Sequence, residues 1–287
     1  MSNSLTLSQL GASNRCATIR GMRSLLCAAL LVGAFAAPAR GADALSDARR
    51  LYNQGDFEAA ERAALEAAKV PATADSARVV LGRIQLERFR KSSSATDLDA
   101  GIGSLRSVDA RRLDARDKAE LAVGLGEALY LDDRYGAAAA MFQSVLDADA
   151  ALQQAGHERV LDWWATAIDR QAQGRPPAER AELYARITSR MHAEVSRSPG
   201  SLPAGYWLVA ASRASGDPEQ AMNEALAAWV RASLAPDRGV TLRADLDRLV
   251  TEGILPDRAA RLPARERGGA LGSMTAEWEA FKARWTR

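Results

Sequence analysis

The chain has 287 residues, of which 47% are hydrophobic and 26% are charged, and its formal net charge is +2. These values are those of an ordinary globular protein that can bury one or two cores. Without residues 1–41, which hold four arginines and no acidic residue, 34 basic residues face 36 acidic ones. This near balance gives no electrostatic reason to expect nucleic acid or a membrane surface as a partner.

Residues 1–41 have the composition of a secretory signal peptide. Arg20 and Arg23 precede an apolar run from Leu25 to Ala37, and small residues come after it. A charged start, a short apolar core and small residues at the cleavage site are the features of such a peptide. The run has 13 residues, whereas a helix that spans a bilayer needs about 20.

We therefore expect a bacterial protein that is exported by the general secretory (Sec) route, because no pair of adjacent arginines precedes the apolar run. Cleavage is expected near Gly41, with a cut after Ala39 as the second choice. Translation from Met22 would give a more compact signal peptide, and a buried core helix is the alternative for the whole segment. The mature protein is expected in the periplasm or outside the cell, without stable insertion into the membrane.

Helical periodicity dominates the chain from Ala44 onward. No stretch shows the sustained alternation of a strand, and Gly and Pro fall in short clusters between runs of 12 to 16 residues. We interpret Lys91–Thr96 as an inserted loop. Helix pairs are predicted at about 44–70, 73–112, 116–150, 157–197 and 203–234.

Three junctions between a turn and a helix share a pattern, at residues 53–60, 131–138 and 214–221. Each has a Gly or Asp that can turn the chain, then an aromatic residue or Pro, then Ala. Two antiparallel helices approach closely where a small side chain lies at their crossing. A large residue one turn later fills the adjacent space, as Phe142 does after Ala138.

This pattern resembles the tetratricopeptide repeat, in which Leu-Gly precedes an aromatic residue in the first helix and Ala then Phe occur in the second. Gly82 and Gly126, each preceded by Leu, stand where the repeat has its Leu-Gly. The resemblance implies an all-α superhelix, or solenoid, of helix hairpins over residues 42–235.

The resemblance also implies that the first helices of the pairs line a concave groove that receives a peptide or protein segment. By this analogy the residues that face the groove are Arg83, Glu120, Glu127 and Tyr130. Glu120 and Glu127 are two turns apart, so they share a helix face. The alternative is that these are simply solvated helix positions.

Residues 236–287 form a separate helical segment in our interpretation. Leu242–Leu249 is a short amphipathic helix, Pro256 and Pro263 interrupt the helical pattern after it, and Gly268-Gly269 begins a flexible link. A last helix at 274–286, with Ser273 as its N-cap, carries one apolar stripe made of Met274, Trp278, Phe281 and Trp285. An array of repeats needs its open end covered, so we expect this helix to be a cap, with a partner-binding helix as the alternative.

Few residues suggest chemistry. Cys16 and Cys27 lie in the predicted signal peptide, so the mature chain would have no thiol. His157-Glu158 begins like the zinc-protease pattern, but Leu161 stands where the second histidine is needed. No phosphate loop or nucleophile elbow is present. We therefore expect no catalytic residue, no cofactor and no metal site, although spacing cannot show whether the fold brings carboxylates together.

Two weaker patterns are also given structural interpretations. Asp245 and Asp247 are two residues apart, so on a helix they point in different directions and favour a solvated face over a metal pair. A sugar-stacking platform is less favoured than packing between helices for the aromatic residues Trp163, Trp164, Tyr206, Trp207 and Trp229.

The sequence therefore predicts a periplasmic or secreted scaffold that is not an enzyme and that binds a protein or peptide of the cell envelope. One alternative is an envelope glycan-binding protein or a cell-wall enzyme. It would use a pocket between the array and residues 236–287. A purely structural subunit of an envelope assembly is the third possibility.

Overall fold

The computed structural model describes residues 36–148 and 154–286, and every regular element within these ranges is a helix. The predicted all-α class is confirmed. Residues 1–35, which include most of the predicted signal peptide, lie outside the described part, so export stays a prediction. Among the helices of the described part, none has the length and apolarity to cross a membrane.

The N-terminal half consists of helices that pack in chain order. Each helix contacts the next, and α1, α3 and α5 also contact one another in succession. The predicted pairs at 44–70, 73–112 and 116–150 each correspond to two of these helices. Their bounds are α1 Ala36–Asn53, α2 Phe57–Ala68, α3 Ala74–Ser92, α4 Ala95–Arg106, the short η1 Ala110–Arg112, α5 Ala115–Leu131 and α6 Tyr135–Asp147.

The C-terminal half continues the succession. Helices α7, α9 and α11 contact one another in turn, as the odd-numbered helices of the first half do. Pro256 does not interrupt the helical pattern, contrary to the prediction. It lies in the first turn of α12, where a missing N–H is tolerated. The bounds are α7 Gln154–Gln173, α8 Pro177–Arg197, α9 Leu202–Ala214, α10 Pro218–Arg231, η2 Ala232–Leu234, α11 Val240–Leu249, the π turn η3 Val250–Ile254, α12 Leu255–Ala260 and α13 Arg267–Trp285.

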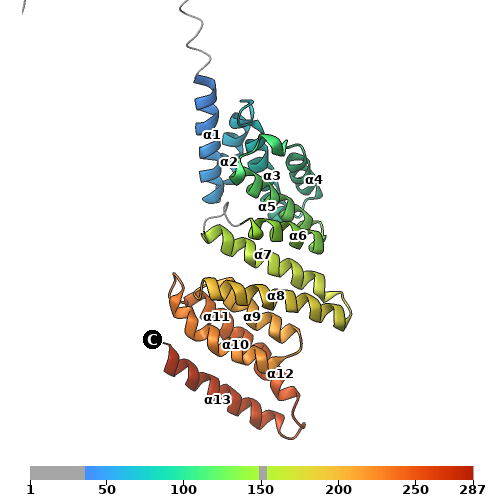
Figure 1. Cartoon of the computed structure of the whole chain (residues 1–287), viewed down its shortest axis with the longest axis vertical. Coiled ribbons are helices and arrows are strands. Elements are labelled where there is room, and N and C mark those ends of the chain that lie inside the picture. The colour runs from blue at the N-terminus through green and yellow to red at the C-terminus, as the bar shows by residue number, and fades with distance from the viewer. Residues whose placement is uncertain (1–35, 149–153, 287) are drawn as a thin grey trace, which may run out of the picture.

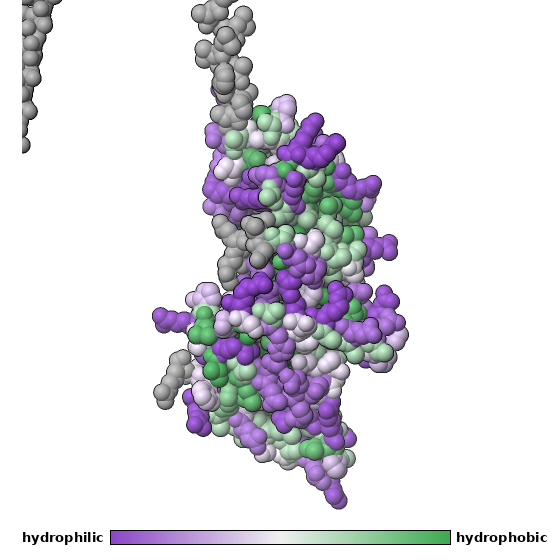
Figure 2. Space-filling view, in the orientation of Figure 1, coloured by the Kyte–Doolittle hydropathy of each residue, from purple (hydrophilic) through white to green (hydrophobic). Residues whose placement is uncertain are grey.

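The helices are layered along the long axis of the molecule, with α1 at one end and α13 at the other (Figure 1). Helices α7 and α8 run across the middle, and they are among the longest, with 20 and 21 residues. Polar and apolar residues alternate over most of the visible surface, and apolar side chains gather beside the place of α11 (Figure 2).

The three junctions predicted from the sequence share one backbone geometry. The third residue of each has a positive φ: 79° at Gly55, 57° at Asp133 and 91° at Gly216. The amide of the next residue then donates to the carbonyl five residues earlier, over 3.1, 2.8 and 3.1 Å respectively. This left-handed residue with a six-to-one hydrogen bond is the Schellman ending of a helix. It explains why Gly or Asp recurs at this place.

The small residues of the same junctions lie at helix crossings. Ala60, Ala138 and Ala221 are completely buried. Gly126 on α5 leaves room for the ring of Phe142 on α6, since an added Cβ would lie 2.6 Å from Phe142 Cε1. The packing argument made from the sequence is therefore confirmed at this crossing.

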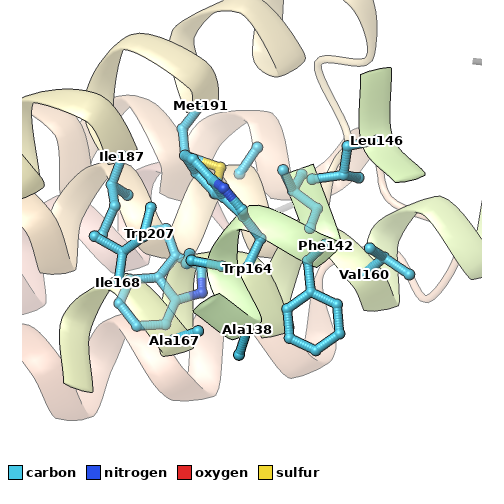
Figure 3. Packing of buried hydrophobic residues seen from close by; sticks show 14 of the residues in the cluster. Ala138, Phe142, Leu146, Val160, Trp164, Ala167, Ile168, Ile187, Met191 and Trp207 are labelled. Carbon is cyan, nitrogen blue, oxygen red and sulfur yellow. The ribbon is translucent and has the colours of Figure 1, made fainter. Parts of the chain in front are cut away.

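The largest buried cluster joins α5 and α6 to α7, α8 and α9. Trp164 is 2% exposed and lies beside Met191 (Figure 3). Phe142 on α6 and Ile168 on α7 lie on either side of it (Figure 3). Trp207 packs into the same cluster from α9. The core thus runs through the middle of the molecule and couples its two halves.

The loop predicted at Lys91–Thr96 is absent. Lys91 and Ser92 continue α3, and only Ser93 and Ser94 separate it from α4. Ser93 has a φ of 57°, which reverses the chain direction within two residues. The extra residues are therefore accommodated by a longer helix.

The C-terminal helix begins seven residues before the predicted start at residue 274. Gly268 and Gly269 lie in its first turn rather than in a flexible link, and Ser273 is inside the helix rather than at its N-cap. Leu271, which follows these glycines in the same helix, packs against the C-terminal core.

Candidate binding groove

Three of the four predicted groove residues come together on α3 and α5. Arg83 Nε lies 3.5 Å from Glu127 Oε2, and its guanidinium lies 4.8 Å from the ring centre of Tyr52 on α1. Glu120 accepts a hydrogen bond of 3.0 Å from Arg116 and pairs with Arg49 at 3.8 Å. The expected residues therefore form one charged cluster.

This cluster is closed rather than open. The side chain of Glu127 is 1% exposed, and Arg90 approaches its second carboxylate oxygen at 3.8 Å. Burial alone would lower the pKa of Arg83, but Glu127, Tyr52 and Glu120 outweigh burial and raise it. The adjoining cavity has a volume of only about 20 Å³, enough for about one water molecule. The prediction that Glu127 faces a groove is therefore wrong, because its charge is used inside the fold.

Tyr130 lies apart from this cluster. Its ring centre is 5.2 Å from that of Tyr135, and it packs against the central core. A hydrogen bond with Tyr130 raises the pKa of Arg170 on α7. The structure therefore does not bring all four predicted groove residues into one site.

Most of the apolar stripe of the last helix is packed against the rest of the protein. Trp278 is completely buried, donates 2.8 Å to Asp247 and lies 5.1 Å from Trp229. Met274 and Phe281 pack against the same core, whereas Trp285 remains 46% exposed. The helix docks on α10 and α12, which is the arrangement that a cap requires.

An open groove lies instead across α7, α9 and α11. Two hollows of about 400 and 630 Å³ share the lining residues Glu158, Leu202 and Pro203, so they adjoin and are treated together as one groove. We call it the α7–α9–α11 groove. The first hollow is lined by Glu158, Arg159, Asp162, Leu202, Pro203, Tyr206, Thr241, Leu242 and Asp245, and the second adds Arg197, Ser198, Pro199, Gly200, Leu234 and Pro236.

The three helices contribute to the first hollow in the same way. Each supplies three residues with the spacing i, i+1 and i+4. They are residues 158, 159 and 162 on α7, residues 202, 203 and 206 on α9, and residues 241, 242 and 245 on α11. Residues spaced in this way share one helix face. Successive odd-numbered helices therefore present the same face to the groove.

The second hollow is formed where two connecting segments meet. Gly200, before α9, approaches the segment before α11 so closely that an added Cβ would lie 2.5 Å from Leu234 O. Pro199 and Pro236 line the hollow beside it. Leu234 is 64% exposed, so this end of the groove offers an uncovered apolar wall.

The polar groups of the groove are held in defined positions. Glu158 accepts a hydrogen bond of 2.9 Å from Ser201, and burial raises the pKa of its carboxyl. Asp162 accepts 2.8 Å from Trp207 Nε1, and Asp245 pairs with Arg248 at 3.2 Å. Carboxylates from two separate helices are thus brought to one depression, which spacing in the sequence could not show.

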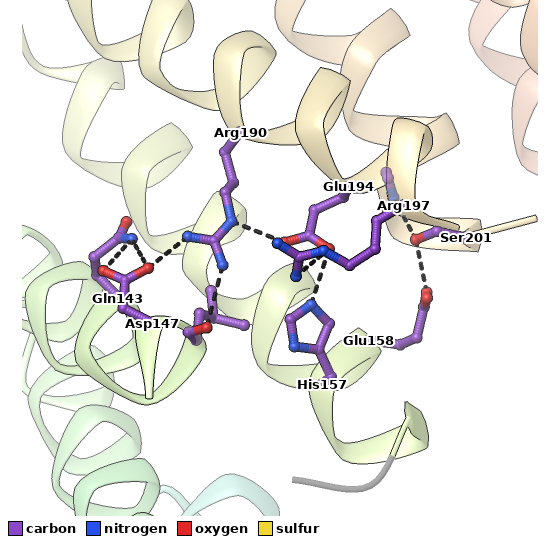
Figure 4. Close-up of polar contacts among 10 residues, drawn as sticks. Gln143, Asp147, His157, Glu158, Arg190, Glu194, Arg197 and Ser201 are labelled. Carbon is purple, nitrogen blue, oxygen red and sulfur yellow. Dashed lines mark hydrogen bonds and ion pairs between the residues drawn. The ribbon is translucent and has the colours of Figure 1, made fainter. Parts of the chain in front are cut away.

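A network of ion pairs supports this end of α7. Glu194 on α8 accepts from Arg190 over 2.9 Å, pairs with His157 at 3.0 Å and lies 3.8 Å from Arg197 (Figure 4). Arg190 also reaches Asp147 at the end of α6 over 2.8 Å. The network ties three helices together and fixes His157, the neighbour of Glu158. His157 thus has a structural partner in Glu194.

Replacing Glu194 by glutamine is expected to lower the free energy of unfolding by about 1–2 kcal/mol near neutral pH. Burial alone would raise the pKa of Glu194. Hydrogen bonds from His157 and Arg190 outweigh the effect of burial, so the pKa is lowered from 4.5. A carboxyl whose pKa is lower in the folded than in the unfolded protein stabilises the fold at pH values above its unfolded pKa. This stabilisation is lost as the pH falls through the folded pKa. Urea unfolding should show the difference fully at pH 6 and a smaller difference at about pH 3, because the stabilisation is lost as the pH falls through the folded pKa.

Glu179→Gln on the same helix is the matched control, because its side chain is 54% exposed and pairs with Arg175 in the preceding turn. This variant should match the unchanged protein at both pH values. An E194Q deficit that persisted undiminished at the low pH would contradict the assigned ionisation of Glu194.

Some groove residues stand out in the sequence and others do not. Tyr206 belongs to the aromatic set that could form a sugar platform, and Asp245 is half of the weak metal pair. Asp247 indeed points elsewhere, toward Trp278 and Lys282. Leu234 carries no signal, because its importance depends on which connecting segments meet, and Pro203 is an ordinary residue of the first turn of α9.

Comparison with known proteins gives no family: no protein-family model and no curated protein matches this chain. Within the described residues, no group of three or more His, Cys, Asp or Glu side chains is placed to hold a metal ion. The site must therefore be interpreted from its own geometry.

Proposed function

We propose that this protein is an exported interaction scaffold, a tetratricopeptide-like solenoid whose α7–α9–α11 groove binds a peptide or protein segment in the bacterial envelope. The observation that carries the proposal is the equivalent contribution of three successive helices to one open depression. A surface built from repeated positions suits an extended chain, whose own side chains recur at regular intervals.

The other features of the structure support this proposal. The helices pack in chain order and end in Schellman turns at the predicted junctions. The last helix buries Trp278 against the final helices of the array. The groove is open and partly apolar, as a site for a chain segment requires, whereas the charged cluster around Glu127 is closed.

Panning a random peptide library against the purified protein tests this function. We expect enriched peptides to bind in the groove, and Leu234→Asp to weaken them at least about tenfold, since burying a leucine contributes about 1.5–3 kcal/mol. Leu65→Asp on α2 is the control, because Leu65 is another exposed leucine, 50% against 64% for Leu234, but lines no part of the groove. Absence of enrichment, or equal binding by L234D, would refute the proposal.

An envelope glycan is the second candidate ligand. The groove does lie between the array and residues 236–287, and it holds Tyr206 beside three carboxylates, of which Glu158 has a raised pKa. Paired carboxyl groups with different pKa values are the machinery of glycoside hydrolysis. Release of reducing ends from peptidoglycan that is lost in Glu158→Gln would establish this function in place of the scaffold.

A further inference from the structure

We infer that the occupant of the α7–α9–α11 groove is a partner segment that carries a large apolar side chain next to lysine or arginine. This inference rests on the proposed scaffold function and names the chemistry of the partner. It depends on the different character of the two hollows, which share one boundary at Glu158, Leu202 and Pro203.

The first hollow favours a cation. Its lining has three carboxylates, from Glu158, Asp162 and Asp245, against the one guanidinium of Arg159. Of the three, Asp245 also has an arginine partner outside the lining, Arg248 at 3.2 Å. The three carboxylates do not converge as a metal site would require. They are spread over α7 and α11, which suits a long side chain with a distributed charge, such as arginine or lysine.

The second hollow favours an apolar side chain. Leu202, Pro203, Leu234 and the neighbouring prolines form its walls, and its only basic lining residue, Arg197, lies 3.8 Å from Glu194. Leu234 is 64% exposed, and Val240, next to the groove residue Thr241, is 73% exposed. An apolar patch exposed beside a hollow is typical of an interaction site.

The shared boundary places the two chemistries side by side in the partner. A chain lying in both hollows places its apolar residue and its cation on neighbouring positions rather than at distant points. The groove should therefore distinguish partner segments by the charge next to their apolar residue. Acidic segments are excluded because their carboxylates would lie beside those of the groove.

Short fluorescent Gly/Ser peptides test the inference by fluorescence polarisation with the full chain. One carries a leucine pair followed by an arginine pair, and the others replace the arginines by glutamates or by serines, or the leucines by serines. The leucine–arginine peptide should bind most tightly and weaken as salt rises. Asp245→Lys should weaken it at least about threefold at low salt.

Asp47→Lys is the matched control. Asp47 pairs with Arg50 one turn later at 2.9 Å, as Asp245 pairs with Arg248 at 3.2 Å, and both are substantially exposed. Asp47 lies on α1, outside the groove. The control should leave the affinity unchanged, while both variants retain the same helical circular dichroism.

The outcomes separate this inference from the proposed function. If leucine peptides bind and Leu234→Asp weakens them, but arginine gives no advantage and Asp245→Lys has no effect, the scaffold stands and this inference fails. If no peptide binds at all, both fail. Sedimentation that shows a dimer dissociated by Leu234→Asp would assign the groove to a second copy and also overturn the inference.

Discussion

Replacing Gly126 by valine is expected to lower the free energy of unfolding by about 1–3 kcal/mol, the usual cost of forcing extra carbon atoms into a packed core. A Cβ at this position would lie 2.6 Å from Phe142 Cε1 and 2.9 Å from its Cδ1. Phe142 is 1% exposed, and its ring centre is 5.9 Å from that of Trp163 on α7. The ring therefore has no solvent to retreat into, and α5 and α6 must move apart.

Urea unfolding followed by circular dichroism measures this effect. Gly103→Ala is the matched control, because Gly103 is also inside a helix but nothing lies within 4 Å of an added Cβ. The control should be stabilised by about 0.5–1 kcal/mol, since alanine favours the helix. Opposite signs for the two glycines would confirm that the crossing determines the cost. Equal stabilisation of both would show that α5 and α6 are not in close contact.

The helix crossing at Gly126 was predictable because it depends on local spacing. Leu-Gly on one helix and Ala-x-x-x-Phe on the next lie within 18 residues, from Leu125 to Phe142. The Schellman turns were predictable for the same reason, since Gly55 and Gly216 need a positive φ within a few residues. Short-range packing and turn chemistry are thus the part of this fold that the amino-acid pattern expresses directly.

The closed state of the charged cluster could not be predicted, because it depends on distant partners. Glu127 lies 44 residues from Arg83, and Asp117 lies 68 residues from its partner Arg49. From helical spacing alone, Glu127 looks like a solvated position or a groove residue. Only the packing of α1, α3 and α5 against one another shows that its charge is paired inside the fold with Arg83 and Arg90.

The groove itself illustrates the same limit. Its acidic end combines residues 158 and 162 with residue 245, and its apolar end needs Gly200 to approach the backbone of Leu234. No periodicity links these positions. The helices that supply them are predictable from the sequence, but the register in which α7, α9 and α11 meet is not.

Replacing Trp278 by alanine is expected to have the largest effect, a loss of about 3–5 kcal/mol of stability in the C-terminal part, as for other buried tryptophans. The indole is completely buried, lies 5.1 Å from the ring centre of Trp229 and stacks with Phe281 at 5.7 Å. It also donates 2.8 Å to Asp247, which Lys282 contacts at 2.7 Å. The change therefore leaves a cavity and removes the polar contact that orients α13 on α11.

A cap and a freely exchanging partner helix give different results for this variant. In arrays of helix pairs each unit is stabilised by its neighbours, so release of the last helix exposes the apolar surface beneath it. Trp278→Ala should then lower the urea midpoint of the C-terminal core and speed proteolysis before α13, near Pro263. Trp285→Ala, on the same helix but 46% exposed, should change either measurement little. If Trp278→Ala released α13 without loosening α10 to α12, the helix would be a separable partner-binding element rather than the cap.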